Sequence, residues 1–264
     1  MIAPTLLRLT TTLVASAVFV SMAQASPETI TFPSSDRVTI TGDLYLASEN
    51  KQTPFILLFH QADSSRGEYS EIAPKLAAEG FNCLAIDQRS GGTNQGIDNA
   101  TLKSAEAAGV RTGFPDALPD LLAAAKYARN NHAEGPIIAW GSSYSAALVL
   151  KLAGDYPSGF AGVLAFSPGE YFGSFGMSER WIQTSAKNIT APAFVTSAKN
   201  EEPQWRPIFD AIPATTVKTS YLPPTKGQHG SKALWAEFPD HEGYWDAVMQ
   251  FLEQWKPAPV ASTY

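Results

Sequence analysis

The sequence predicts an α/β fold: a doubly wound, mostly parallel sheet with an N-terminal antiparallel hairpin. Three observations support this prediction. Residues 29–32 and 38–46 alternate apolar and polar side chains around a polar turn, as a half-exposed hairpin does. Later segments of strand length, such as residues 55–59, are continuously apolar, which is typical of strands buried on both faces. Helical patterns separate these segments, and strands that alternate with helices favour parallel βαβ units.

The first 25 of the 264 residues have the features of a secretory signal peptide. Residues 9–20 form a short apolar segment, and residues 23–25 (Ala-Gln-Ala) are a small-x-small cleavage signature. The apolar segment is too short to cross a bilayer comfortably, which weighs against an uncleaved anchor helix. We therefore expect residues 26–264 to form a single domain that is periplasmic or secreted.

Composition excludes several classes of function. The net charge is −6 and no basic cluster is present, so nucleic acid and, after signal cleavage, membranes are poor candidates as partners. The only cysteine, Cys83, lies in a predicted buried strand, so it is interpreted as a core thiol and no intramolecular disulfide is expected. The four histidines and this cysteine share no ligand spacing, and we expect no metal site.

The remaining elements follow in order along the chain. Residues 69–77 have helical spacing, and Gly80 ends that helix. Residues 87–111 are rich in Gly, Asn and Ser and are predicted to be mostly loop. Residues 169–188 are aromatic and rich in Gly and Ser, so they could cap a cleft or form a surface excursion. We predict helices at 115–131, 144–153, 207–212 and 245–255, and strands at 83–86, 136–140, 162–166, 193–197 and 217–222.

The most informative segment is a strand, a sharp turn of small residues and a helix around Ser143. In a nucleophile elbow the central residue sits on a strained turn, and small residues are needed two positions before and after it. With Ser143 at the centre these positions hold Gly141 and Ser145. With Ser142 at the centre they would hold a tryptophan and a tyrosine, and centring Ser145 would move the turn into the helix. Ser143 is therefore the predicted nucleophile, and the alternative is a serine that only caps the helix.

With these residues the chain resembles the α/β-hydrolase superfamily, particularly small single-domain members such as dienelactone hydrolase. The resemblance extends over essentially everything after residue 26. Besides the elbow it rests on three segments that follow predicted strands, namely residues 59–61, 87–92 and 227–230. In this family the nucleophile, the acid and the histidine follow in that order along the chain.

The resemblance implies that His229 is the general base, because it follows the last predicted strand in a glycine-flanked loop. A serine hydroxyl is a poor nucleophile until an imidazole takes its proton. The rival His241, beside the final helix, is interpreted as a surface residue. His60 resembles the strand-end histidine that organises the oxyanion loop in this family.

The resemblance places the acid after the strand at residues 193–197. An ungapped match puts Asn200 there, but an amide cannot carry the charge that stabilises an imidazolium. A shift of one residue gives Glu201, and Glu202 is the next candidate. We favour Glu201 over Glu202, because the acid must reach the histidine.

Two backbone N–H groups are expected to bind the oxyanion. Tyr144 opens the helix after the nucleophile, and amides at a helix N-terminus stabilise an anion. The second donor is expected in the loop after residues 55–59, where Ala62 is the first candidate and Gln61 the alternative. Asp87 and Arg89 resemble a structural pair that holds loops at the strand ends.

These residues predict an exported serine hydrolase that cleaves a small ester or lactone through an acyl-enzyme and needs no cofactor. The alternatives are a peptidase or amidase of the same fold, and a non-catalytic binding protein on the same scaffold. The aromatic residues Phe172, Phe175 and Trp181 are interpreted either as an acyl pocket or as packing. The oligomeric state and the natural substrate are left open.

Overall fold

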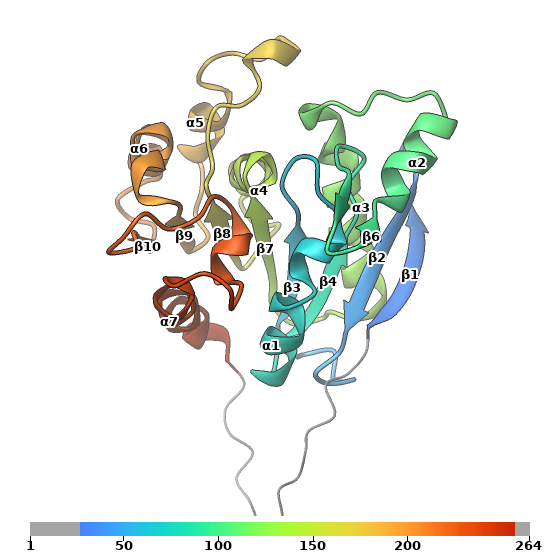
Figure 1. The fold of residues 1–264 in the computed structure, drawn as a ribbon, viewed down its shortest axis with the longest axis horizontal. Coiled ribbons are helices and arrows are strands. Elements are labelled where there is room, and N and C mark those ends of the chain that lie inside the picture. The colour runs from blue at the N-terminus through green and yellow to red at the C-terminus, as the bar shows by residue number, and fades with distance from the viewer. Residues whose placement is uncertain (1–26, 257–264) are drawn as a thin grey trace, which may run out of the picture.

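The computed structural model describes residues 27–256, so the expected signal segment 1–25 lies outside the described residues. An eight-stranded sheet runs through the molecule in the order β1-β2-β4-β3-β7-β8-β9-β10 (Figure 1). Its strands are β1 (Glu28–Pro33), β2 (Thr39–Tyr45), β3 (Phe55–Phe59), β4 (Asn82–Ile86), β7 (Ile137–Ser142), β8 (Gly162–Phe166), β9 (Ala193–Thr196) and β10 (Lys218–Tyr221). Strand β2 pairs antiparallel with β1 and β4, and every later pair in this sheet is parallel.

Helices cover both faces of the sheet, as in a doubly wound fold (Figure 1). On one face α1 (Ile72–Ala78) and α7 (His241–Leu252) pack on side chains such as Leu58 and Trp140. On the other face lie α2 (Ala100–Ala107), α3 (Leu118–Asn131), α4 (Tyr144–Asp155), α5 (Trp181–Ala186) and α6 (Glu202–Ala211). The central strands β3, β4, β7 and β8 are buried along their whole length, because both faces are covered. The predicted fold class is confirmed.

The segment 87–111, predicted as mostly loop, contains regular structure, and that prediction is wrong in part. The short strands β5 (Thr93–Asn94) and β6 (Ile97–Asp98) form a separate ribbon, and α2 follows at Ala100–Ala107. Asn99 caps α2, since its side chain accepts a hydrogen bond from the Leu102 N–H. Only Thr101 and Ala105 of α2 are buried, so the helix has no apolar stripe for the pattern to detect.

Two other helices begin earlier than predicted. Helix α6 starts at Glu202 instead of residue 207, with Pro207 inside it, and α7 starts at His241 instead of residue 245. Among residues 27–256, no helix is long and apolar enough to cross a membrane.

Both ends of the described chain lie at the amino-terminal edge of the parallel strands, at the bottom of Figure 1. Glu28 pairs with Leu44 in β2, close to the start of β4. At the other end Trp255 packs on Gly162, the first residue of β8. The candidate site described next lies at the opposite, carboxyl-terminal edge, where ligands bind in open α/β sheets.

Candidate active site

Ser143 occupies a strained turn between β7 and α4. Its φ is +58° and its ψ is −120°, a backbone conformation that residues with a side chain rarely adopt. A Cβ on Gly141 would collide with the backbone of Ser145, so the chain can turn this sharply only with glycine at that position. The Ser143 N–H donates to the Phe166 carbonyl at 2.7 Å, which fixes the turn against the end of β8.

Ser145 stands where the family motif carries its second glycine, and its hydroxyl has a structural role. Its Oγ accepts a hydrogen bond from the Ser142 N–H at 3.0 Å and lies 2.6 Å from the Phe59 carbonyl oxygen. The small side chain therefore ties the first turn of α4 to the end of β3. It allows the close approach of strand and helix that the elbow requires.

Glu201 and His229 meet at the same edge of the sheet. Glu201 ends the 3₁₀ helix η4 (Lys199–Glu201) after β9, and its Oε1 lies 2.6 Å from His229 Nδ1. Its other oxygen accepts hydrogen bonds from Ser167 Oγ at 2.7 Å and from the Ala198 N–H at 3.2 Å. Burial alone would raise the pKa of Glu201, but the hydrogen bonds from His229 and Ser167 and the His229 charge lower it below the usual glutamate value.

The other candidates for the acid and the base point elsewhere. Glu202 pairs with Arg206 one turn along α6, at 3.1 Å from its Nε. Asn200 is exposed. His241 opens α7, where its Nδ1 lies 2.7 Å from the Phe238 carbonyl oxygen. Of the three candidate acids, only Glu201 reaches His229.

The His229 loop is attached to the elbow by backbone and side-chain hydrogen bonds. The Ser231 N–H donates to Ser142 Oγ at 2.8 Å, and the Gly230 N–H donates to Ser167 Oγ at 2.9 Å. Within residues 27–256 no hydrogen bond joins Ser143 to His229, whose only partner is Glu201. Because Glu201 occupies Nδ1, the imidazole keeps Nε2 for a serine proton. Such bonds are often long in enzymes without substrate and tighten when it binds.

Ala62 is the better placed of the two candidates for the second oxyanion donor. The Gln61 N–H donates to Glu68 Oε2 at 2.8 Å and is therefore engaged. His60 holds the next peptide, which carries the Ala62 N–H, with Nδ1 at 2.7 Å from the Gln61 carbonyl oxygen, while its Nε2 accepts from the Gln88 N–H at 2.9 Å. Because Nε2 accepts this hydrogen bond, the ring hydrogen is on Nδ1 and donates to Gln61, and burial lowers the pKa of His60. Tyr144 is the first residue of α4, a position at which the backbone N–H has no partner within the helix.

The aromatic segment between β8 and α5 divides into two parts. Phe172 is buried and packs edge-on against Trp181 with ring centroids 4.9 Å apart, so these two side chains hold the segment together. Phe175 is 40 % exposed and contacts Phe114, which stacks on the Tyr144 ring. Phe175 is therefore connected to α4 through Phe114 and the Tyr144 ring.

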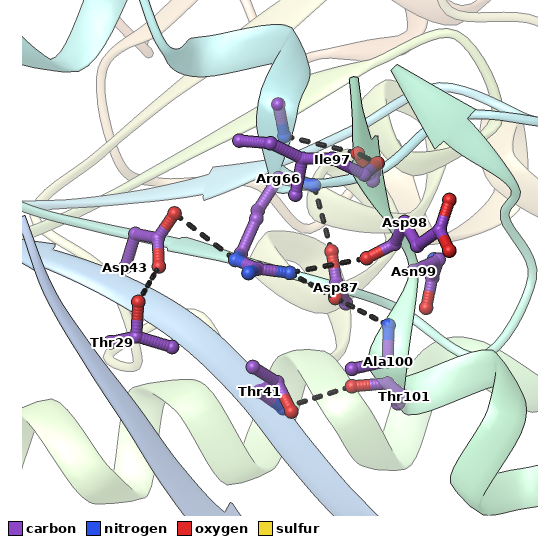
Figure 2. Close-up of polar contacts among 12 residues, drawn as sticks. Thr29, Thr41, Asp43, Arg66, Asp87, Ile97, Asp98, Asn99, Ala100 and Thr101 are labelled. Atoms are coloured by element: carbon purple, nitrogen blue, oxygen red, sulfur yellow. Dashed lines mark hydrogen bonds and ion pairs between the residues drawn. The ribbon is translucent and has the colours of Figure 1, made fainter. Parts of the chain in front are cut away.

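The strand-end charges pair differently from the expectation for Asp87 and Arg89. Asp87 pairs with Arg66 at 2.7 Å, and Arg66 also reaches Asp43 at 3.0 Å (Figure 2). Arg89 instead pairs with Asp120 at 2.7 Å and with Asp36 at 2.6 Å. The two arginines thus anchor different loops, and the Arg66 cluster attaches the 3₁₀ helix η1 (Arg66–Tyr69) to the sheet.

Two residues that contribute hydrogen bonds to the candidate site, Ser167 and Glu68, belong to none of the sequence motifs. Ser167 follows β8 with a φ of +57° and connects Glu201 to the His229 loop. The only sequence signal for Ser167 was its position directly after a predicted strand, the next strand along the chain after the one that leads into the elbow. Glu68 contacts both Gln61 and Ser142, and nothing in the sequence around it marks a buried carboxylate.

A family model described as "Serine aminopeptidase, S33" matches residues 50–194, more than half of the chain. The chain belongs to this family. The S33 proteins are α/β hydrolases, so the resemblance to that superfamily is confirmed and the chain is a hydrolase of the α/β fold. A search of the curated proteins found no match.

Solved structures support the same fold assignment for this S33 chain. It is similar to an esterase of Pyrococcus furiosus at 19 % identity and a TM-score of 0.63, covering 88 % of this chain and 93 % of that one. A dienelactone hydrolase of Anabaena variabilis aligns at 15 % identity and 0.65, covering 89 % and 100 %. An acylaminoacyl peptidase of Pyrococcus horikoshii aligns at 18 % and 0.62, covering 94 % of this chain but 44 % of that one. At these identities the likeness concerns the fold alone.

Proposed function

We propose that this protein is an exported serine esterase that hydrolyses small esters or lactones through an acyl-enzyme on Ser143. The observation that carries the proposal is the 2.6 Å contact between Glu201 and His229, at the strand ends where the strained Ser143 elbow also lies. A positioned base with its own carboxylate is what a serine hydroxyl needs in order to attack a carbonyl carbon.

In the proposed reaction His229 Nε2 takes the Ser143 proton while Oγ bonds to the carbonyl carbon. The oxygen of that carbonyl becomes an oxyanion and receives hydrogen bonds from the Tyr144 and Ala62 N–H groups. Glu201 stabilises the imidazolium through Nδ1. The C–O bond to the leaving alcohol then breaks and that alcohol takes the proton from His229. Water, deprotonated by His229, repeats the sequence on the acyl-enzyme and releases the acid together with free Ser143.

A peptidase or amidase is the second candidate. It is favoured by the description of the matching family, and a peptidase is also among the similar structures. Esters remain our first proposal because two of those similar structures, an esterase and a dienelactone hydrolase, align over nearly their whole length. The described domain is correspondingly compact.

The test compares wild type with Ser143→Ala on p-nitrophenyl acetate, p-nitrophenyl butyrate, a γ-lactone and an amino acyl p-nitroanilide. We expect ester or lactone turnover, a loss of more than about 10⁴-fold in Ser143→Ala, and covalent fluorophosphonate labelling at Ser143. Ser158→Ala, in the exposed turn before β8, is the matched control and should keep full activity. Faster cleavage of the anilide would instead favour the peptidase. A folded wild type that neither turns over nor labels would refute both and leave a binding protein.

Export is proposed from residues 1–25 alone. If the signal segment is cleaved as expected, N-terminal sequencing of protein recovered outside the cytoplasm should begin at Ser26.

A further inference from the structure

Glu68 is a fully buried carboxylate that the proposed reaction does not use. It lies in η1 between the oxyanion loop and α1 and has no exposed surface. The three other buried carboxylates among the described residues, Asp43, Asp87 and Asp120, each pair with an arginine. Across residues 27–256 Glu68 forms no ion pair. Burial of an unpaired carboxylate is costly, so its position calls for a functional explanation.

The carboxyl group of Glu68 joins three segments that carry the proposed catalytic groups. Oε2 accepts the Gln61 N–H at 2.8 Å, and Gln61 immediately precedes Ala62. Oε1 accepts the Ser142 hydroxyl at 2.6 Å, and Ser142 immediately precedes Ser143. The same hydroxyl oxygen accepts the Ser231 N–H, two residues after His229.

Both oxygens of Glu68 act as hydrogen-bond acceptors. The Gln61 N–H donates to Oε2, and the Ser142 hydroxyl, which itself accepts from the Ser231 N–H, donates to Oε1. The 2.6 Å distance between Ser142 Oγ and Glu68 Oε1 is at the short end of the range for hydroxyl hydrogen bonds. Burial raises the pKa of Glu68, while the Ser142 and Gln61 hydrogen bonds and the charges of His229 and Lys232 act in the opposite direction.

The surroundings make this junction rigid. Arg66 attaches η1 to the sheet through Asp43 and Asp87, and the Trp235 indole donates to the Glu68 carbonyl at 3.0 Å. His60 holds the Gln61 carbonyl from the other side. With these groups in place, Glu68 fixes the His60–Gln61 peptide through its N–H and His60 fixes the Gln61–Ala62 peptide through its carbonyl, so the Ala62 N–H can turn only if one of these two hydrogen bonds breaks.

We propose that Glu68 is a positioning residue, whose carboxylate holds the Ala62 N–H and the Ser143 elbow in the mutual geometry that oxyanion binding requires. The inference rests on the proposed esterase function. Glu68 touches no reacting atom and acts through Gln61 and Ser142. A glutamine there offers one acceptor oxygen to two converging donors, so one of the two contacts is lost while the shape is kept.

The test measures Glu68→Gln with p-nitrophenyl acetate, with rates divided by the number of sites titrated by a fluorophosphonate. We expect kcat per titrated site to fall about tenfold to hundredfold, less than the loss of a whole oxyanion donor, with KM within about threefold. The inhibition constant of a small alkylboronic acid should rise by a similar factor, because its Ser143 adduct mimics the tetrahedral oxyanion. Ser142→Ala, which removes the same link from the other side, should lower kcat in the same way.

The matched control is Asp120→Asn, a buried carboxylate paired with Arg89 outside this junction. It should lower the melting temperature and the number of titrated sites but leave kcat per titrated site within about twofold. The same outcome for Glu68→Gln would overturn the inference, since a merely structural residue changes the number of sites and not their rate. If wild type is active and the kcat of Glu68→Gln is unchanged, only the positioning role of Glu68 is refuted. If folded wild type is neither active nor labelled, the proposed esterase function and the role of Glu68 are refuted together.

Discussion

Replacing Glu201 by glutamine tests the proposed triad with almost no change of side-chain volume. In the native protein Oε1 faces His229, and Oε2 faces two donors, Ser167 and the Ala198 N–H. A glutamine has one acceptor oxygen, and we expect it to stay where two donors converge. The NH₂ group then faces His229 Nδ1, which must accept a hydrogen bond and leave the ring hydrogen on Nε2. That tautomer cannot take the Ser143 proton.

The expected loss follows from this tautomer change. Trapping the histidine of a serine triad in the wrong tautomer costs about 10⁴ in kcat, and some ring flipping would reduce the loss to about 10³. These factors correspond to roughly 4 to 5.5 kcal/mol of transition-state stabilisation. Initial rates on p-nitrophenyl acetate per mole of folded protein measure the effect, with folding checked by thermal unfolding.

Glu202→Gln is the matched control, one residue away in the chain. It removes only a half-exposed pair with Arg206 on the α6 surface, worth about 0.3–0.5 kcal/mol of stability. Activity should stay within about twofold of wild type. A Glu201→Gln enzyme that keeps more than a tenth of wild-type kcat would refute the assignment of the acid. So would a Glu202→Gln enzyme that loses more of its kcat than Glu201→Gln does.

Three further predictions concern stability and reactivity. Gly141→Ala places a Cβ against the Ser145 backbone and should lower the free energy of unfolding in urea by about 2 kcal/mol or more. Gly173→Ala is the control, because its Cβ meets open space, and its free energy of unfolding should stay within about 0.5 kcal/mol of wild type. Equal losses in the two variants would contradict the steric explanation of the elbow. Burial raises the pKa of Glu68, so its ionisation favours the unfolded state once the pH rises above the ordinary glutamate value of about 4.3. The unfolding free energy of Glu68→Gln relative to wild type should therefore increase as the pH rises above that value, and a difference that does not change with pH would argue against a raised pKa. Cys83 is buried, and burial also raises the pKa of its thiol. A disulfide reagent should therefore react with no thiol in the folded protein and with one after denaturation. Rapid reaction of the native protein would show that Cys83 is accessible.

Much of the fold was predictable because its signals are local. The run at residues 55–59 is apolar since helices cover both of its faces, and β3 spans those same residues. Helix α2 escaped detection because a cap at Asn99 and two small buried residues suffice to form it. The start of α6 was hidden by Pro207, a residue that normally argues against a helix interior.

The site was predictable where a backbone constraint selects the residue. The steric demands of the turn favoured Ser143 from sequence alone. The choice between Glu201 and Glu202 depended on which side chain η4 turns towards His229, and that requires three dimensions. Glu68 could not be found, because a glutamate in a polar segment normally predicts an exposed side chain. Its burial depends on contacts with Ser142 and Trp235, which are distant in the sequence.

The location of the two chain ends has a practical consequence for attaching this protein to other objects. Glu28 and Trp255 both lie at the amino-terminal edge of the parallel strands, with the full length of the strands between them and Ser143. A lipid, a bead, an affinity tag or a fused domain joined at either end would therefore hold the protein with its elbow directed into solution. Immobilised protein should retain access to bulky esters, provided that an amino-terminal fusion is joined after residue 25, where the signal segment is expected to be cleaved.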